Sequence, residues 1–483
     1  MYQDATIEEV QAALEKSYAA FKSYAKLPLK SRASLMKAIA SEIEKLGDEL
    51  IQITMQETNL PEARLKGERA RTIYQLNSYA DACEKGDWLE ARITAAIPDR
   101  TPPRPDIRKM MVPVGPVVVF GSSNFPYAYS TAGGDTASAL AAGCSVVVKA
   151  HPAHPKTSAL VASAIQKALA TQGLDPNIFI HLYGASHEVG KALVTNHRTK
   201  AVGFTGSMQG GMALFNWANQ RKEPIPVFAE MGSVNPVYLF PDKLKADSVS
   251  VAQMYAESIT LGVGQFCTNP GVIVGIDSVY LESFAESLAE KIQAIQLGKM
   301  LHEGIADSYR AKSAEMLKQA SVVSLTPDSG NENSIQAIVA KTTAAEFLKN
   351  TKLHQEVFGP FSLLVTCKNM DEMKAVAASM EGQLTSSLLA TVEEIRAHED
   401  LVDDIKEKCG RMILNGVPTG VEVCQAMHHG GPFPATTDSR FTSVGPDAIK
   451  RFARPVSFQN FPDSLLPDEL KLENPLLIHR IVE

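Results

Sequence analysis

The sequence predicts an α/β protein built around a doubly wound parallel sheet. From residue 114 onward, short apolar runs that suit buried strands alternate with amphipathic or Ala-rich helical stretches. A second alternating region runs from Gly271 to about Val417. The length of 483 residues suits roughly three domains of about 150 residues each.

Two helices are expected at the start of the chain. Thr6 and Glu9 have the spacing of a capping box ahead of an apolar face. A second helix is expected after Pro28, with Gly47 as its stop. The segment 98–113 then carries prolines at 98, 102, 103, 105 and 113, which argues against a helix or a central strand. We expect an extended arm there that contacts a neighbouring subunit.

The first sheet is expected to contain the apolar runs at 117–120, 145–149, 178–183, 201–205 and 237–240. The helices between them are expected near 130–142, 157–171, 187–196 and 208–220. A longer helix at about 244–261 leads into the second region. The proline-rich tail from Phe441 is expected to return to the first domain or to pair with a neighbouring subunit.

Composition and charge narrow the function classes. Lys and Arg number 47 against 54 Asp and Glu, with no basic stripe, so nucleic acid is not an expected partner. The apolar runs are too short to cross a bilayer, and Asp4 and Glu8 stand where a signal peptide needs basic and apolar residues. The six scattered cysteines form no C-x-x-C pair, which indicates reduced thiols and no metal site. We therefore expect a cytoplasmic protein without a membrane partner.

The sharpest motif runs from Gly264 through Gln-Phe-Cys267-Thr-Asn-Pro to Gly271. Its glycines and proline allow a tight turn that presents the Cys267 thiol at a cleft. A thiolate there is a nucleophile toward a carbonyl carbon. The alternative is a small buried thiol within a turn.

Two polar side chains follow apolar runs. Glu230 ends the run from Val227, where burial is expected to raise its pKa toward that of a useful general base. Asn124 follows the strand at 117–120, at the edge where open α/β sheets build their sites, and its amide can donate to an oxyanion. The alternatives are a surface carboxylate and a turn-forming Asn before Pro126.

Two strand ends are candidate nucleotide contacts. Lys149 ends an apolar strand beside a loop and a helix start, where it can meet a ribose or a phosphate. Gly206 and Ser207 open a helix after the strand at 201–205 and offer free N–H groups to a phosphate. The competing interpretations are a solvated lysine and an ordinary Gly-Ser turn.

Together these motifs resemble the aldehyde dehydrogenase superfamily, and they occur in the order that this family shows. The likeness covers nearly the whole chain. The segments that carry it are Ser123-Asn-Phe-Pro126, Val147-Val-Lys149, Phe204-Thr-Gly-Ser207, Glu230-Met-Gly232, Gly264-Gln-Phe-Cys267 and Glu356-Val-Phe-Gly-Pro360.

The resemblance implies a three-part architecture. A Rossmann-like NAD(P)-binding domain uses 1–90 and 114–243, and an α/β catalytic domain uses 244–440. A small β oligomerisation element combines 91–113 with 441–483. By the same resemblance, a homodimer or a homotetramer is expected.

The resemblance also implies roles for the matching residues. Cys267 is the nucleophile, Glu230 the general base, and Asn124 the oxyanion donor together with the Cys267 backbone N–H. On the cofactor side, Lys149 contacts the adenosine ribose and Ser207, with Gly206 beside it, the pyrophosphate. Glu356 contacts the nicotinamide ribose, and Phe358 packs near the nicotinamide.

The implied reaction oxidises an aldehyde to a carboxylic acid, with NADP or NAD, through a cysteine thiohemiacetal and a thioester. Members with a strong NAD preference often carry a Glu three residues after the strand-end lysine, where this chain has Pro152. The missing carboxylate removes a barrier to a 2′-phosphate, for which His151 and Lys156 are candidate contacts. Asn59 also departs from the family, in which glycine is usual there.

Within the superfamily, three segments resemble the α-ketoglutarate semialdehyde dehydrogenases: 149–155, 230–236 and 441–446. The expected small-molecule substrate is therefore α-ketoglutarate semialdehyde. The alternatives are a fatty or other aldehyde, and a non-catalytic protein that retains the fold. An anionic substrate predicts a cationic pocket, for which Arg440 is a candidate.

Overall fold

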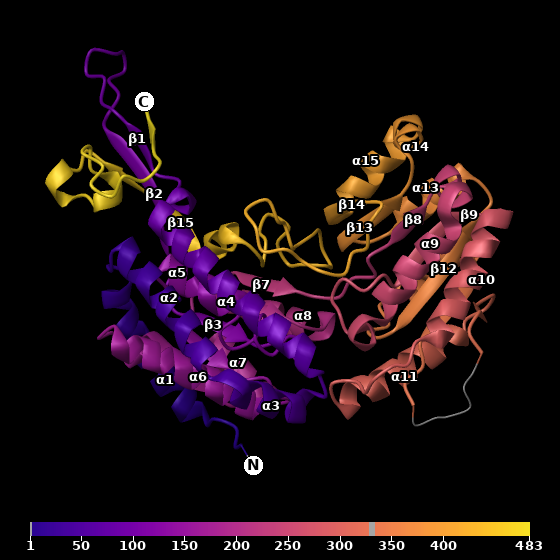
Figure 1. The fold of residues 1–483 in the computed structure, drawn as a ribbon. Helices are drawn as coiled ribbons and strands as arrows, with labels where there is room; N and C mark the ends of the chain where they lie inside the picture. Colours follow the sequence, from indigo (N-terminus) through magenta and orange to yellow (C-terminus); the bar gives the residue numbers. More distant parts are fainter. Residues whose placement is uncertain (1, 328–333) are drawn as a thin grey trace.

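A five-stranded parallel sheet lies at the centre of the first lobe in the computed structural model, which describes residues 2–327 and 334–483 (Figure 1). Its strands are β3 (Val117–Phe120), β4 (Val146–Lys149), β5 (Phe179–Leu182), β6 (Ala201–Thr205) and β7 (Val227–Glu230). They lie in the order β5-β4-β3-β6-β7, so the chain leaves β3 on one side and returns on the other. The carboxyl ends of β3 and β6 therefore form the switch point at which doubly wound sheets build binding crevices.

Helices cover both faces of this sheet because its strands are apolar on both sides. Val117 and Val119 face one hydrophobic core, whereas Val118 faces the other. The covering helices are α1 (Ile7–Tyr24), α2 (Leu29–Lys45), α3 (Gly47–Thr58), α4 (Glu62–Lys85), α5 (Gly134–Ala142), α6 (Pro155–Thr171), α7 (His187–Thr195) and α8 (Met208–Asn219).

The predicted boundaries of the first two helices are confirmed. The Thr6–Glu9 capping box is present, with the Glu9 N–H donating to Thr6 Oγ1 over 3.2 Å. Gly47 takes a left-handed φ of 56°, which ends the run of α2, but the chain re-enters a helix at once as α3.

A seven-stranded sheet forms the second lobe, in the order β10-β11-β12-β9-β8-β13-β14. All its pairings are parallel except that of β10 with β11. The strands are β8 (Val237–Leu239), β9 (Val272–Ile276), β10 (Val323–Ser324), β11 (Ile338–Thr343), β12 (Phe361–Cys367), β13 (Gln383–Leu389) and β14 (Cys409–Leu414). The helices are α9 (Pro241–Thr260), α10 (Val279–Ala294), α11 (Glu303–Leu317), α12 (Ala344–Lys349), α13 (Met370–Ser379), α14 (Val392–Ala397) and α15 (Glu399–Glu407).

The expectation that the apolar run at 237–240 belongs to the first sheet is wrong. β8 pairs with β9 and β13 in the second sheet. An apolar run indicates a buried strand but not which sheet buries it. The chain crosses between the sheets after Glu230 and before Val237, ahead of the expected domain boundary at 243.

A four-stranded sheet projects from the first lobe and joins residues far apart in the sequence. It consists of β15 (Ala453–Gln459), β2 (Ile107–Pro113), β1 (Arg92–Thr94) and β16 (Ile481–Val482), in that order. The predicted association of 91–113 with the tail is therefore present. The exclusion of a central strand is wrong, because β2 pairs with both β1 and β15. Four of the five prolines precede β2, and Pro113 is its last residue.

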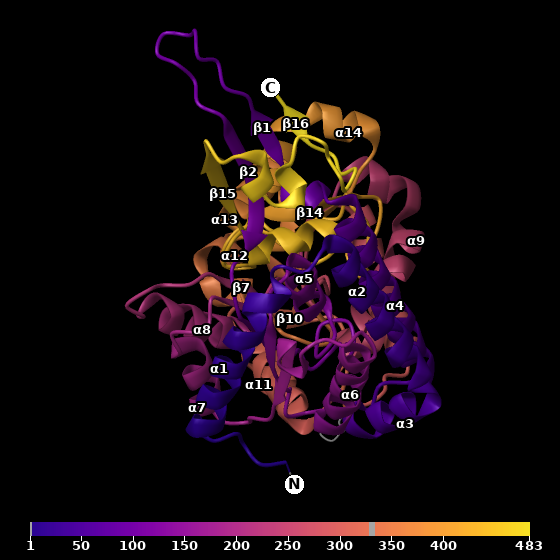
Figure 2. The same cartoon turned by 90° about the vertical axis from the view of Figure 1, so that its left-hand side faces the viewer.

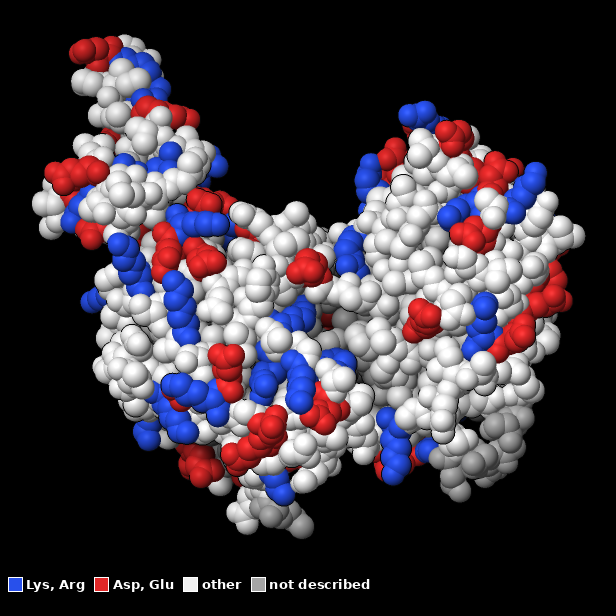
Figure 3. Space-filling model, in the orientation of Figure 1, with Lys and Arg blue, Asp and Glu red and all other residues white. Residues whose placement is uncertain are grey.

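The molecular surface shows no single-sign charge field on the face in view. Figure 3 shows Lys and Arg interspersed with Asp and Glu over both lobes, and Figure 2 shows the hairpin of the β element extending away from the helices. Among the described residues, no helix combines the length and the apolar character that a membrane crossing requires.

Candidate active site

The edges of the two sheets meet at the predicted catalytic residues. Asn124 follows β3 and Glu230 ends β7, so both lie at the carboxyl edge of the first sheet. Cys267 lies in the loop before β9, at the amino edge of the second sheet. Asn124 Nδ2 donates to the Gln265 carbonyl oxygen over 3.1 Å, and the Cys267 thiol interacts with the Glu230 carboxylate. The structure therefore brings all three side chains to one place.

A buried amide holds the Cys267 loop against the second sheet. Asn235 Nδ2, which is fully buried, donates to the carbonyl oxygens of Cys267 and Asn269, each over 2.9 Å. Val263, just before the motif, takes a φ of 58°, which is rare for a β-branched residue and marks backbone strain. The thiol is thus carried on a backbone that its surroundings constrain.

The same loop packs directly against the segment that ends at Pro360. A Cβ atom at Gly264 would lie 2.3 Å from the Gly359 backbone, and Gly264 has a φ of 67°, so only glycine fits there. Asn269 Nδ2 donates to the Gly359 carbonyl oxygen over 3.0 Å. The nucleophile loop and residues 356–360 therefore form one packed unit.

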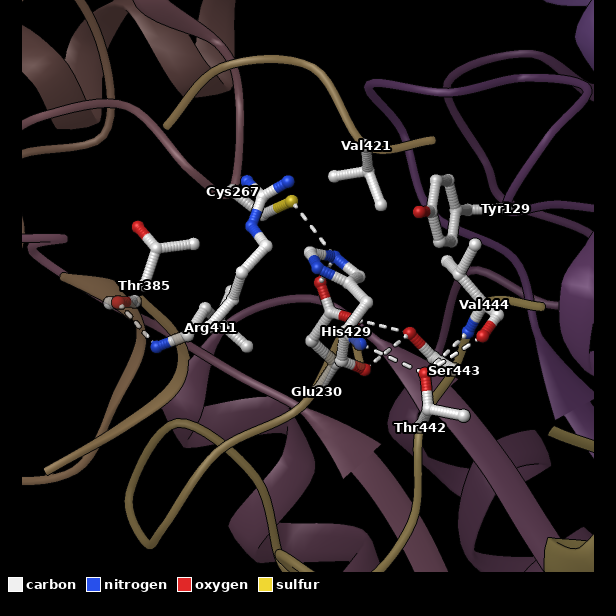
Figure 4. Close-up of polar contacts among 12 residues, drawn as sticks. Tyr129, Glu230, Cys267, Thr385, Arg411, Val421, His429, Thr442, Ser443 and Val444 are labelled. Carbon is white, nitrogen blue, oxygen red and sulfur yellow. Dashed lines mark hydrogen bonds and ion pairs between the residues drawn. The ribbon is translucent and has the colours of Figure 1, made fainter. Parts of the chain in front are cut away.

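His429 and Glu230 are buried beside the half-buried Cys267, and the three side chains form one cluster (Figure 4). Its Nε2 atom lies 3.6 Å from Cys267 Sγ and 3.1 Å from Glu230 Oε1. Ser443 Oγ donates to Glu230 Oε2 over 2.8 Å. The thiol, imidazole and carboxylate atoms all lie within 4.8 Å of one another, so this cluster could hold a divalent metal ion as well as transfer a proton.

Neither His429 nor Ser443 was identified as catalytic from the sequence. Both reach the site because the chain returns from the second lobe and runs along the edge of β7. Met231 N–H donates to the Ala435 carbonyl oxygen, and Thr437 N–H donates to that of Ala229. No local pattern signals this return, and His428-His429 in the sequence offers only a histidine pair.

The pKa of Glu230 moves opposite to the expectation from the sequence. Burial acts to raise it, but the His429 imidazole and the hydrogen bonds from His429, Ser443 and Cys267 hold the pKa of this carboxyl below its ordinary value. Glu230 is therefore a carboxylate at neutral pH. Burial, with the neighbouring Glu230 charge, raises the pKa of the Cys267 thiol well above its ordinary value. The resting pair is a thiol beside a carboxylate.

The predicted nucleotide contacts line the carboxyl edge of the first sheet. Lys149 ends β4, and its Nζ donates to the Gly184 carbonyl oxygen over 2.6 Å; burial lowers the pKa of Lys149 to about 8. Gly206 and Ser207 are exposed at the start of α8, next to the switch point. Ser207 Oγ accepts from Gly210 N–H, which leaves the first N–H groups of α8 for a phosphate. This donor set fits a dinucleotide.

Glu356 and Phe358 lie on the other side of the thiol loop. Glu356 is half-buried against Gly232, where a Cβ atom would meet its Oε2 at 2.8 Å. Burial raises the pKa of Glu356 to about 7. Phe358, Phe266 and Asn269 line a small pocket beside this carboxylate. The arrangement suits a ribose with an aromatic ring beside it.

His151 and Lys156, the candidate contacts for a 2′-phosphate, differ in the charge that they can present to it. Burial and the stacked His154 ring hold the pKa of His151 well below its ordinary value, so this ring is neutral. The Lys156 N–H already donates to the Glu57 carboxylate over 2.9 Å, although the Lys156 side chain is exposed. Arg440 is also exposed and forms a two-point ion pair with Asp438, so this candidate for the substrate pocket is already paired.

Comparison with known proteins gives one consistent result. The model of the aldehyde dehydrogenase family matches residues 1–433. An α-ketoglutaric semialdehyde dehydrogenase of Azospirillum brasilense is 48% identical over 98% of this chain and 91% of its own length. One from Acinetobacter baylyi is 44% identical over 100% and 92%.

Solved structures show the same fold at low sequence identity. A glyceraldehyde-3-phosphate dehydrogenase of Methanocaldococcus jannaschii, complexed with NADP, superposes with a TM-score of 0.79 at 20% identity, covering 95% of both chains. A betaine aldehyde dehydrogenase of Staphylococcus aureus superposes with a TM-score of 0.81 at 18% identity, covering 95% of this chain and 89% of that one. With the family match over most of the sequence and the cluster of Cys267, Glu230 and His429 where its two sheets meet, the chain belongs to the aldehyde dehydrogenase family.

Proposed function

We propose that the protein oxidises α-ketoglutaric semialdehyde to α-ketoglutarate with NAD or NADP. The observation that carries the chemistry is the buried contact of Cys267 with Glu230 and His429. The two relatives with 44% and 48% identity over nearly the whole chain support the choice of substrate. In this proposal the first lobe binds the nucleotide, and the second lobe supplies the nucleophile.

The first step is deprotonation of Cys267. Glu230 is the acceptor, because its carboxylate is ionised and contacts the thiol. His429 Nε2 lies within reach of both the sulfur and the carboxylate, and as an N–H it stabilises the negative charge wherever it resides. The resulting thiolate attacks the aldehyde carbon.

The second step forms a tetrahedral oxyanion on the substrate. Asn124 Nδ2 donates one N–H to the Gln265 carbonyl oxygen, and its second N–H is the donor for the oxyanion. NAD or NADP, when held at Lys149, Ser207 and Glu356, would supply the hydride acceptor for this carbon. A thioester on Cys267 remains. Glu230 releases the thiol proton to solvent and, as a carboxylate again, removes a proton from the water that attacks the thioester, which frees the carboxylic acid and leaves the sulfur to be reprotonated.

Steady-state kinetics with purified protein test this function. We expect kcat/KM for α-ketoglutaric semialdehyde to exceed that for tetradecanal by at least about 100-fold, with α-ketoglutarate as the product. Each aldehyde is assayed with NAD and with NADP. A preference for tetradecanal would overturn the substrate, and oxidation by a Cys267→Ala variant would overturn the mechanism.

We also propose that the protein acts in the cytoplasm as a homodimer or a homotetramer. The six cysteines are free, which suits a reducing compartment. The four-stranded sheet projects from the first lobe and ends on one side at β15, whose outer edge is unpaired among the described residues. Multi-angle light scattering of the full chain checks this: a monomer at micromolar concentration contradicts the oligomer.

A further inference from the structure

The charges of two arginines from opposite lobes act on the Cys267 thiol. Arg71 comes from α4 of the first lobe and Arg411 from β14 of the second. Both side chains are half-buried, and the charge of each acts on Cys267. Neither was singled out from the sequence.

The two guanidinium groups are held by one loop. Arg71 Nη2 lies 3.4 Å from the Val421 carbonyl oxygen and 3.4 Å from the Tyr129 hydroxyl. Arg411 Nη1 donates to the Gly420 carbonyl oxygen over 3.0 Å. Both guanidinium groups therefore donate to consecutive carbonyl groups of one loop, those of Gly420 and Val421.

Figure 4 shows how this side of the site is arranged. The Cys267 sulfur, the Arg411 side chain, Val421 and Tyr129 lie on one side of His429. Glu230 lies on the other side, with Ser443. In this view the end of the Arg411 side chain therefore lies beside the sulfur, on the side of His429 away from Ser443.

No carboxylate of the described residues forms an ion pair with Arg71 or Arg411. Of the three buried arginines of the described residues, Arg108 and Arg451 pair with Asp463 and Asp135, whereas Arg32 donates to two carbonyl oxygens and has no ion pair. Arg71 Nη1 and Arg411 Nε are buried without any hydrogen-bond partner. A buried cation with an unused N–H is costly unless a ligand supplies the missing acceptor.

The carboxylate on α4 that acts on Arg71 is already engaged. Glu68 pairs with Arg64 over 2.7 Å and accepts the N–H groups of Tyr127 and Ala128. The acceptors that Arg71 and Arg411 do have are neutral carbonyl and hydroxyl oxygens. The two positive charges are thus uncompensated by the protein beside the thiol.

We propose that Arg71 and Arg411 together bind the carboxylate of the substrate while its aldehyde carbon meets Cys267. This inference rests on the proposed function, because α-ketoglutaric semialdehyde carries an aldehyde at one end of a five-carbon chain and a carboxylate at the other. A carboxylate has two oxygens with which to bridge two guanidinium groups, and guanidinium N–H donors match its geometry. The anion would fill the unused donors and neutralise the neighbouring charges.

The test compares matched aldehydes in Arg71→Gln and Arg411→Gln variants. The readout is the ratio of kcat/KM for α-ketoglutaric semialdehyde to kcat/KM for pentanal, which has the same chain length but no carboxylate. We expect the ratio to fall by on the order of 100-fold in each variant, because each loses a charged hydrogen bond to the anion. Lysine in place of either arginine keeps the charge and retains part of the ratio. The Arg440→Gln variant removes an exposed, already paired arginine and leaves the ratio unchanged.

A second measurement uses the wild-type protein and so does not depend on whether a variant folds. Alkylation of Cys267 by iodoacetamide is followed by mass spectrometry with 2-oxopentanoate or with pentan-2-one, which differ only by the carboxylate. We expect 2-oxopentanoate to slow alkylation at least about 10-fold more than pentan-2-one does. Equal protection by the two compounds overturns the inference.

The outcomes separate this inference from the proposed function. If the wild-type protein prefers neutral aldehydes, the proposed substrate fails whatever the arginines do. If it prefers α-ketoglutaric semialdehyde but the Gln variants keep the full ratio, the substrate stands and the arginine site is wrong.

Discussion

The two sides of the Cys267 thiol differ in how completely their polar groups are satisfied. On one side, Glu230 accepts hydrogen bonds from His429 and Ser443 and is held as a carboxylate. On the other side, Arg71 and Arg411 have buried N–H groups that meet no partner, and no ion-paired carboxylate, among the residues that the structure describes. The hydrogen bonds of Glu230 are thus formed before substrate binds, so its carboxylate is already held in place as a proton acceptor. The unsaturated side keeps unused N–H donors, to which an anion could bind.

Replacing Cys267 removes the sulfur on which both sides of the site act, and it has the largest expected effect on activity. Cys267→Ala should lower kcat for any aldehyde by at least about 10,000-fold, because no covalent intermediate can form. Activity is measured by the absorbance of reduced nicotinamide, and binding of the cofactor by fluorescence titration. Cofactor binding should remain, and its loss would show that the variant damaged more than the nucleophile. Cys409→Ala, a second half-buried thiol, is the matched control and should retain activity.

Removing the charge on the saturated side tests the role of Glu230. Glu230→Gln should lower steady-state kcat by on the order of 1,000-fold, because both thiol deprotonation and thioester hydrolysis lose their proton acceptor. Intact-protein mass spectrometry after a single turnover detects a thioester that persists. A variant that turns over at the wild-type rate would show that another group accepts the proton.

His429 connects the sulfur and the carboxylate, so its replacement should have an intermediate effect. His429→Gln should lower kcat by roughly 10- to 100-fold, the range of a lost charged hydrogen bond. His429 lowers the pKa of Glu230, so without it that pKa rises and the acid limb of the kcat–pH profile moves to higher pH. A profile that does not move contradicts the coupling. His428→Gln, at the adjacent position, is the control and should leave the profile in place.

The charge of Lys149, at the edge of the first sheet where the nucleotide is expected to bind, should have the smallest effect, on the Kd of the cofactor. Burial lowers its pKa to about 8, so in the free protein the ammonium is charged below that pH and neutral above it. The Kd of NAD or NADP should therefore rise, by up to about 10-fold, as the pH increases from 7 to 9. Lys149→Arg stays charged over this range and should flatten the dependence. Fluorescence titration of the reduced cofactor measures both, and a Kd independent of pH in the wild-type protein would show that Lys149 does not bind it.

Local sequence patterns were sufficient to predict several strands of the first sheet and the site residues that stand in a recognisable motif. The runs at 117–120 and 201–205 became β3 and β6 with the predicted bounds, since burial on both faces selects continuous apolar residues. Cys267, Glu230 and Asn124 were found because each stands in a motif at a strand or turn. Asn59, a departure from the family pattern, has a left-handed φ of 56° that Asn tolerates, and its amide donates to the Met300 carbonyl oxygen.

What the sequence could not provide depends on contacts between distant segments. His429 acquires its role only where the returning chain lies against β7, and Arg71 and Arg411 come together from different lobes. The pKa of Glu230 was misjudged for the same reason, because burial was visible in the apolar run but its hydrogen-bond partners were not. The central place of β2 likewise depends on β15, which lies hundreds of residues away and pairs with the edge that β1 leaves open.

The backbone contact between Gly264 and Gly359 ties the reactive sulfur to the segment that carries Glu356 and Phe358. No side chain separates the two backbones, so a displacement of residues 356–360 would also displace the loop that carries Cys267. Nucleotide occupancy and thiol accessibility should therefore vary together, so a thiol-directed fluorophore would report cofactor loading without any turnover.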